Sequence, residues 1–179
     1  MNKNGPLGRR EWVLRRNAPL VAPTDRDASV AKPIIAGALN AILADVFDLY
    51  MKTKNCHWYI SGPQFREYHL LLDEQADQLY AMTDPIAKRI RKTGGSTLSS
   101  IGHISLIHRV MNRNTDYGEA LDMLAELCDD NQVLAARLRD VHELFDEQCD
   151  IATAGLIEDW IEQTELRIWF LFEPSPRND

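Results

Sequence analysis

The chain has 179 residues, of which 45% are hydrophobic and 26% charged, and its formal net charge is −7. This length and composition suit one globular domain with a real core, and they exclude collagen-like and mucin-like chains. No apolar run approaches the ~20 residues of a transmembrane helix. We expect no signal peptide, because no apolar stretch with a small-residue cleavage site follows the basic N-terminus.

The first 31 residues contain scattered arginines, glycines and prolines with little apolar periodicity, which predicts a flexible or loosely docked extension. Residues 1–27 hold six Lys or Arg and three Asp or Glu, a net +3, so the other 152 residues carry −10. A basic arm of this kind has no element that reads sequence, so DNA binding through it is expected to be non-specific and salt-sensitive. The alternatives are an ordinary disordered terminus and an arm that packs against its neighbour.

Apolar residues at three- and four-residue spacing predict four long amphipathic helices. The first begins near Lys32, with Pro33 in its first turn, and ends before residue 61. The next long helices are expected over residues 64–92 and about 117–145, with a short helix over residues 97–110 between them. The last carries Ile157, Ile161, Ile168 and Leu171. Nothing reads as a strand, so we predict an all-α four-helix bundle over residues 32–173, followed by a short tail, residues 174–179.

The candidate metal-binding residues lie between positions 54 and 92. His57 and His69 flank the first turn, and His69 and Asp73 are spaced i, i+4 on one helix face. Imidazole and carboxylate together suit Fe(II), Mn(II) or Zn(II). Each residue alone is more often a capping or solvated side chain, so on these residues a metal site and an ordinary helix surface are about equally supported. No Glu is followed by His three positions later, so a ferritin-type di-iron centre inside one bundle cannot be built.

The motif around these histidines identifies a family resemblance. The residues Lys54-Asn55-Cys56-His57-Trp58, Gly62, Phe65, His69 and Leu72-Asp73-Glu74-Gln75 closely resemble the signature of the Dps family, the DNA-binding proteins from starved cells. The resemblance covers roughly residues 33–173. It implies a ferritin-like fold, a hollow dodecamer in the cytoplasm, in some cases associated with the nucleoid, and protection of DNA. It also implies oxidation of Fe(II), preferably with hydrogen peroxide, at sites between subunits, and storage of the ferric mineral inside the shell.

The resemblance places the catalytic and metal-binding residues at His57, His69, Asp73 and Asp84, and at the position four residues after Asp84. Zn or Mn are substitutes that such a ligand set accepts. Helix geometry explains why two chains are needed: Asp73 and Asp84 are 11 residues apart, about 16 Å along a helix. An antiparallel two-fold partner brings Asp84 to the histidines and Asp73 of the other subunit, which gives two equivalent sites for each dimer.

One position departs from the family pattern. Lys88 stands where a glutamate ligand is expected, and an ammonium repels a cation and is placed to pair with Asp84 at i−4. Pro85 is a second disturbance, because proline removes a backbone donor in a helix interior. Three interpretations compete: a weakened site that holds one metal through the histidines, replacement of the ligand by Asp77 or Glu74, or a shell that binds DNA without iron chemistry. We favour the weakened but iron-binding site.

Several other residues have two interpretations each. A solvated acidic loop is the default for Asp140, Asp146, Glu147 and Asp150, whereas the resemblance makes that loop the lining of three-fold pores that attract cations. Trp58 is expected to pack, and the resemblance makes it also a trap for stray oxidising equivalents. The three cysteines have no CxxC spacing, which indicates reduced thiols; we interpret Cys128 and Cys149 as structural and assign Cys56 no reactivity.

Overall fold

The computed structural model describes residues 25–111 and 119–174, with side chains from residue 33 onward. These residues form helices and no strand: α2 (Asp25–Tyr59), α3 (Phe65–Lys92), α4 (Ile101–Ile107), α5 (Ala120–Glu147) and α6 (Ile151–Phe172). The predicted all-α bundle with a short extra helix is thereby confirmed. The chain divides into two units, and the bundle belongs to the second, Ala31–Asp179. Most of the predicted basic extension (residues 1–24) and of the tail (residues 175–179) lies outside the described residues.

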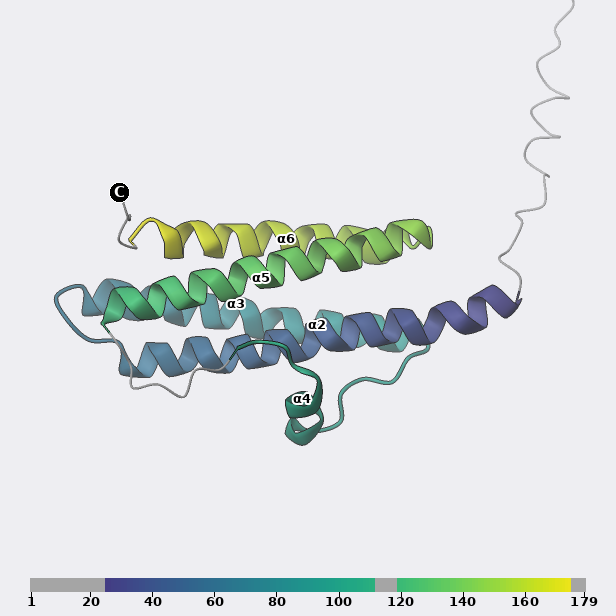
Figure 1. The fold of residues 1–179 in the computed structure, drawn as a ribbon, viewed down its shortest axis with the longest axis horizontal. Helices are drawn as coiled ribbons and strands as arrows, with labels where there is room; N and C mark the ends of the chain where they lie inside the picture. Colours follow the sequence, from purple (N-terminus) through teal and green to yellow (C-terminus); the bar gives the residue numbers. More distant parts are fainter. Residues whose placement is uncertain (1–24, 112–118, 175–179) are drawn as a thin grey trace, which may run out of the picture. The chain divides into compact units, whose positions relative to one another are not determined.

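The four long helices run alongside one another, and α4 lies apart in the connection between α3 and α5 (Figure 1). The helices α5 and α6 pack against each other along their lengths. A short connection of three residues, Gln148, Cys149 and Asp150, joins them, as expected for antiparallel neighbours in a bundle.

The start of α2 differs from the prediction. The sequence pattern placed Pro33 in the first turn, but the helix begins at Asp25, so Pro33 lies inside it. Proline lacks the N–H that would close one helical hydrogen bond, and the helix continues past that missing bond. The prediction failed because proline is a helix-start signal only when nothing upstream is helical.

Glycines flank both ends of α3. Gly62 has φ +107° in the turn before the helix, and Gly94 has φ +86° directly after it, a conformation that favours glycine. Next to it, Gly95 approaches α2 so closely that an added Cβ would lie 2.6 Å from the Cβ of Ala36. The short helix α4 is half as long as predicted: Ser100 caps its start by accepting from His103 N–H, and extended backbone at His108 ends it.

The core draws on all four long helices. Its fully buried apolar side chains include Leu39, Ile42, Leu49, Leu72, Leu79, Ile86, Leu124, Leu138, Phe145, Ile157 and Leu171. Burying each such side chain contributes about 1.5–3 kcal/mol to stability.

The α2 stretch Pro33–Tyr59 is, by length and composition alone, apolar enough to cross a membrane. From the sequence we expected no apolar run of that length. Because eight residues of this stretch belong to the buried apolar core of the bundle, we interpret it as a core helix.

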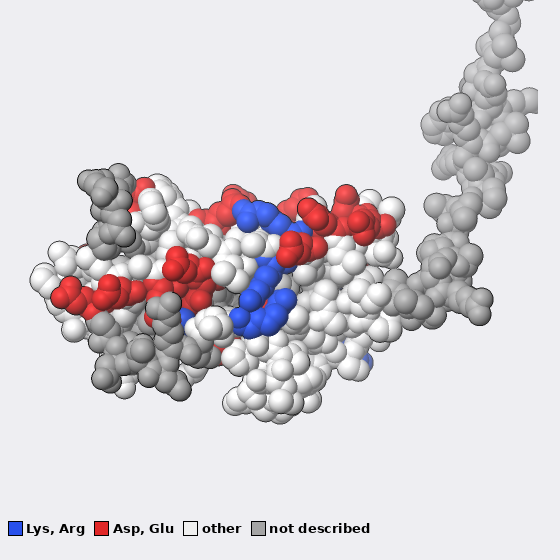
Figure 2. Space-filling view, viewed as in Figure 1, with Lys and Arg blue, Asp and Glu red and all other residues white. Residues whose placement is uncertain are grey.

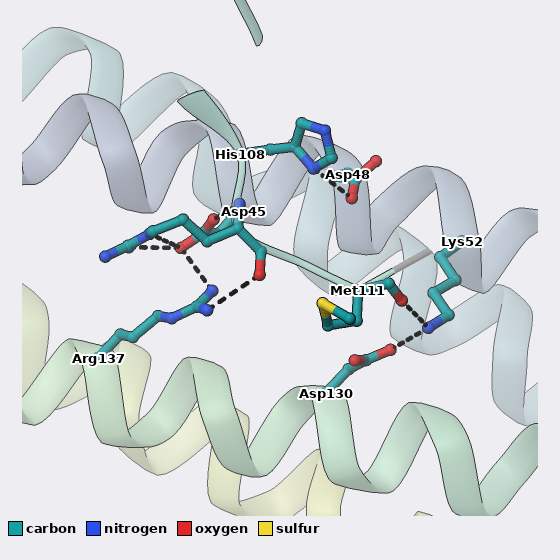
Figure 3. A network of polar contacts seen from close by, with 8 residues as sticks. Asp45, Asp48, Lys52, His108, Met111, Asp130 and Arg137 are labelled. Atoms are coloured by element: carbon teal, nitrogen blue, oxygen red, sulfur yellow. Dashed lines mark hydrogen bonds and ion pairs between the residues drawn. The ribbon is translucent and has the colours of Figure 1, made fainter. Parts of the chain in front are cut away.

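A polar network fastens the segment after α4 to α2 and α5 (Figure 3). Asp45 is 1% exposed and accepts from the Arg109 backbone N–H at 2.7 Å, from the Arg109 guanidinium at 2.5 Å and from Arg137 at 3.0 Å. Lys52 donates to the Met111 carbonyl at 3.0 Å and to Asp130 at 2.5 Å. Burial lowers the pKa of Lys52, but its bonds to Asp130 and Glu126 outweigh burial and leave that pKa raised. These contacts join residues up to 92 positions apart.

Candidate metal site

The two predicted histidine ligands lie against each other where α2 ends and α3 begins. Their rings stack with centroids 3.7 Å apart and planes 24° apart. Nδ1 of His57 lies 3.0 Å from the His69 carbonyl oxygen, and Nδ1 of His69 lies 3.0 Å from the His57 carbonyl oxygen. A carbonyl oxygen only accepts, so each Nδ1 carries the proton. In the neutral rings Nε2 therefore keeps its lone pair, which is the state that binds a metal.

Asp73 joins the histidines from the next turn of α3. Its Oδ1 lies 3.9 Å from His57 Nε2 and 2.7 Å from the ammonium of Lys54. The hydrogen bond from Lys54 lowers the pKa of Asp73, with smaller contributions of the same sign from the two histidines. The structure thus places both His69 and Asp73 next to His57, although the three side chains are not grouped closely enough in one chain to hold a metal ion. It adds Lys54, whose contact the sequence analysis missed, although its i−3 spacing from His57 already put both on one helix face.

Asp84 lies away from this group, further along α3. Its carboxylate is 2.5 Å from the ammonium of Lys88, and the two side chains are 67% and 66% exposed. The pairing expected from the i, i+4 spacing is present. Pro85 does not end the helix, which continues to Lys92. Of the two suggested replacement ligands, Glu74 is exposed and accepts from Gln78 at 3.4 Å, and Asp77 is exposed.

The chain on its own does not assemble a metal centre in the described residues. No three His, Cys, Asp or Glu side chains there are grouped so that they could hold a metal ion. The middle of the bundle contains a buried polar cluster, but Gln75, Asn131, Thr164 and Arg167 provide it and none is a carboxylate. A site that uses Asp84 with the histidines must therefore take residues from two chains.

The acidic turn between α5 and α6 combines a structural carboxylate with exposed ones. Asp150 caps α6 by accepting from Thr153 N–H and binds the Arg89 guanidinium with both oxygens, at 2.5 and 2.8 Å. Burial raises its pKa, but Thr153 and Arg89 outweigh burial and leave that pKa lowered. Asp146 and Glu147 are exposed. Asp150 is thus engaged within its own chain, and the other two remain free to face cations.

Trp58 and the cysteines differ in exposure. Trp58 is 59% exposed, so within one chain it does not have the packing role that we expected. Cys56 is buried, and burial raises the pKa of its thiol to about 11, in line with a thiol that is not reactive. Cys128 is buried, as suits the structural role that we expected, whereas Cys149 is exposed, with φ +56°.

The comparisons place these features in a class of proteins. A ferritin-like domain matches residues 36–173. A DNA protection during starvation protein from Agrobacterium fabrum is 34% identical over 143 residues, which cover 80% of this chain and 88% of that protein. An uncharacterized low temperature-induced protein from Nostoc sp. is 35% identical over 138 residues, or 76% of this chain and 77% of that one.

Solved structures agree with this class. The Dps protein of Vibrio cholerae O1 is 29% identical, with a TM-score of 0.75 over 79% of this chain and 89% of that one. Dps from Thermosynechococcus elongatus has the same fold at 24% identity, with a TM-score of 0.80 over 86% and 97% of the two chains. The fold and the matched residues define a ferritin-like protein. Within that class, the chain belongs to the Dps family.

Proposed function

We propose that this protein oxidises Fe(II) with hydrogen peroxide at sites shared between two subunits and stores the ferric product inside a hollow dodecamer. The observation that carries the proposal is the histidine pair, whose reciprocal Nδ1 contacts leave both Nε2 atoms free for a metal ion. Asp73 supplies the carboxylate, and its lowered pKa keeps it ionised. The Vibrio relative is described as ferritin-like and diiron-carboxylate, which supports iron as the substrate.

The reaction needs two ferrous ions for each peroxide. Each Fe(II) gives up one electron, the O–O bond of hydrogen peroxide breaks, and the products are two Fe(III) and two hydroxide ions. No hydroxyl radical is released if both electrons arrive together. The role of His57, His69 and Asp73 is to hold Fe(II) in place. Asp84 of the partner subunit completes the ligand set, and Zn or Mn are competing metals.

A second subunit is needed for both the site and the surface around α4. On that helix Ile101 and Leu106 are 84% and 82% exposed. Side chains of this size are normally covered in a protein's working state when several occur together. We infer that a two-fold copy covers them, and that six such dimers close the shell.

Lys88 makes the site weaker than one with a glutamate in its place. Its ammonium neutralises Asp84 at 2.5 Å, so Fe(II) must compete with a lysine for that carboxylate. Lys54 competes in the same way for Asp73. The site is therefore expected to bind one ferrous ion tightly through the histidines and a second one poorly.

Iron oxidation is tested by adding Fe(II) and hydrogen peroxide without oxygen and recording ferric absorbance. The unmodified protein is compared with His57→Ala/His69→Ala and with His103→Ala, a matched control on α4. We expect oxidation faster than in buffer for the protein and the control, and a rate equal to buffer for the double variant. Equal rates for all three samples would refute the proposed ferroxidase function.

Protection of DNA is a second candidate function, favoured by the lysine in the metal site and the basic arm. On the face shown in Figure 2, the described bundle carries a stripe and several patches of acidic side chains, with a band of Lys and Arg among them. Residues 1–27 carry +3, and several copies on one particle would add avidity. Association with DNA would place the protein in the cytoplasm at the nucleoid.

Gel retardation of plasmid tests whether the arm binds DNA. The full chain is compared with a chain lacking residues 1–27, at two salt concentrations. Equal binding by both chains would exclude the arm.

A further inference from the structure

The interior of the bundle contains an arginine with no anionic partner. Arg167, on α6, is 1% exposed and is the largest fully buried side chain described. Among the described residues no carboxylate lies within 4.0 Å of its guanidinium. Its Nε donates to Asn131 Oδ1 at 3.0 Å and its Nη2 to Thr164 Oγ1 at 2.7 Å. The remaining nitrogen, Nη1, is buried and has no hydrogen-bond partner.

Neutral acceptors do not balance this charge. Asn131 and Thr164 accept hydrogen bonds but carry no charge, and Met82 offers only a thioether sulfur at 3.7 Å. Burial lowers the pKa of Arg167 to about 10, which still leaves it protonated at neutral pH. An uncompensated buried cation strongly destabilises a folded chain, and an unpaired buried donor adds to that. A bound water would satisfy the donor but not the charge, whereas an anion satisfies both.

The polar cluster around Arg167 lies next to solvent on one side. Arg167 and Gln75 help to line an open cavity of about 40 Å³ between α3 and α6, beside the half-exposed side chains of Leu166 and Phe170. Glu74 also lines this cavity and is the nearest candidate for an internal counter-ion. Its side chain is exposed instead, and its carboxylate accepts from Gln78. The described chain therefore leaves the cation of Arg167 without a partner of its own.

We propose that a small monovalent anion of the halide class binds Arg167 Nη1 inside each subunit, between α3, α5 and α6. The ion supplies the missing partner of Arg167 and so completes the polar cluster of Gln75, Asn131, Thr164 and Arg167, which joins the three helices. This anion site is separate from the metal site and does not depend on iron chemistry.

Thermal unfolding in sodium chloride and in sodium gluconate at equal ionic strength tests the site. We expect the unmodified protein to melt about 2–4 °C higher in chloride, the shift that roughly a sixfold gain in the folding equilibrium produces at this chain length. Arg167→Met keeps the length of the side chain and removes its charge, so it should melt at one temperature in both salts. Arg139→Met is the matched control, because Arg139 is exposed and paired with Glu165, and it should keep the chloride effect. Equal melting of the unmodified protein in both salts overturns the proposal.

Bromide provides a readout that needs no variant. Crystals of the unmodified protein soaked in sodium bromide should show an anomalous peak within hydrogen-bond distance of Arg167 Nη1. Density for a water without anomalous signal, or the Glu74 carboxylate in contact with Arg167, overturns the proposal. Because this measurement uses the native sequence, it stands even if Arg167→Met does not assemble.

Discussion

The two ends of the proposed ligand set are organised in opposite ways. Where α2 ends and α3 begins, His57 and His69 hold each other through two backbone contacts of 3.0 Å and stacked rings, before any metal arrives. Eleven residues beyond Asp73, the Asp84–Lys88 pair is two-thirds exposed, and only the lysine holds the carboxylate. The histidine end is preorganised, whereas the Asp84 end depends on a partner subunit and on release from Lys88. Most of the affinity for iron should therefore come from the histidine end, and the Asp84 end should adjust that affinity.

The largest effect is expected from the histidine end. His57→Ala removes one ligand and also the ring that orients His69. We therefore expect the rate of peroxide-dependent iron oxidation to fall by about 100-fold or more. Stopped-flow ferric absorbance measures this rate, and His142→Ala, a histidine paired with Glu158 away from the site, is the control. A loss under about threefold would mean that the histidine end is not where iron binds.

Arg89, next to Lys88, is expected to contribute to stability but not to iron oxidation. Arg89→Met breaks the two bonds to Asp150 and the one to Thr153, which should lower the free energy of unfolding by about 2 kcal/mol without changing iron oxidation. The pKa of Asp150 is lowered in the folded state, so its contribution is present above the unfolded pKa and is lost as pH falls through the folded value. Thermal melting of protein and variant should therefore differ at pH 7 and converge below about pH 4. A difference that grows as the pH falls would contradict this assignment.

A smaller effect of the opposite sign is expected at the Asp84 end. Lys88→Glu removes the competing ammonium and restores a carboxylate, so we expect roughly tenfold tighter binding of a second ferrous ion, a difference of about 1.4 kcal/mol. Isothermal titration without oxygen measures it. Lys92→Glu, the same charge change one turn further along α3, is the control. Equal affinities for Lys88→Glu and the control would show that position 88 does not face the metal.

Sequence patterns predicted what is local in the chain. Helical periodicity predicted the long helices, and the i, i+4 spacing predicted that Lys88 would pair with Asp84, because neighbours on one helix face meet whatever the rest of the fold does. Contacts across the fold were not predictable in this way. Asp45 meets Arg137 from 92 residues away, and the burial of Arg167 depends on three helices packing around it. The start of α2 was missed because the helix continues upstream of the proline that the pattern treated as its beginning.

Mixing two inactive variants tests most directly whether two subunits share each site. Subunits with His57→Ala/His69→Ala lack the histidine end, and subunits with Asp84→Lys lack the carboxylate end. In a mixed two-fold dimer, one of the two sites regains intact residues from both chains. After dissociation and reassembly of a 1:1 mixture, about a quarter of the sites should be intact by random pairing, and ferric absorbance should recover about a quarter of the unmodified rate. Activity no higher than the mean of the two separate variants would contradict a site shared between subunits.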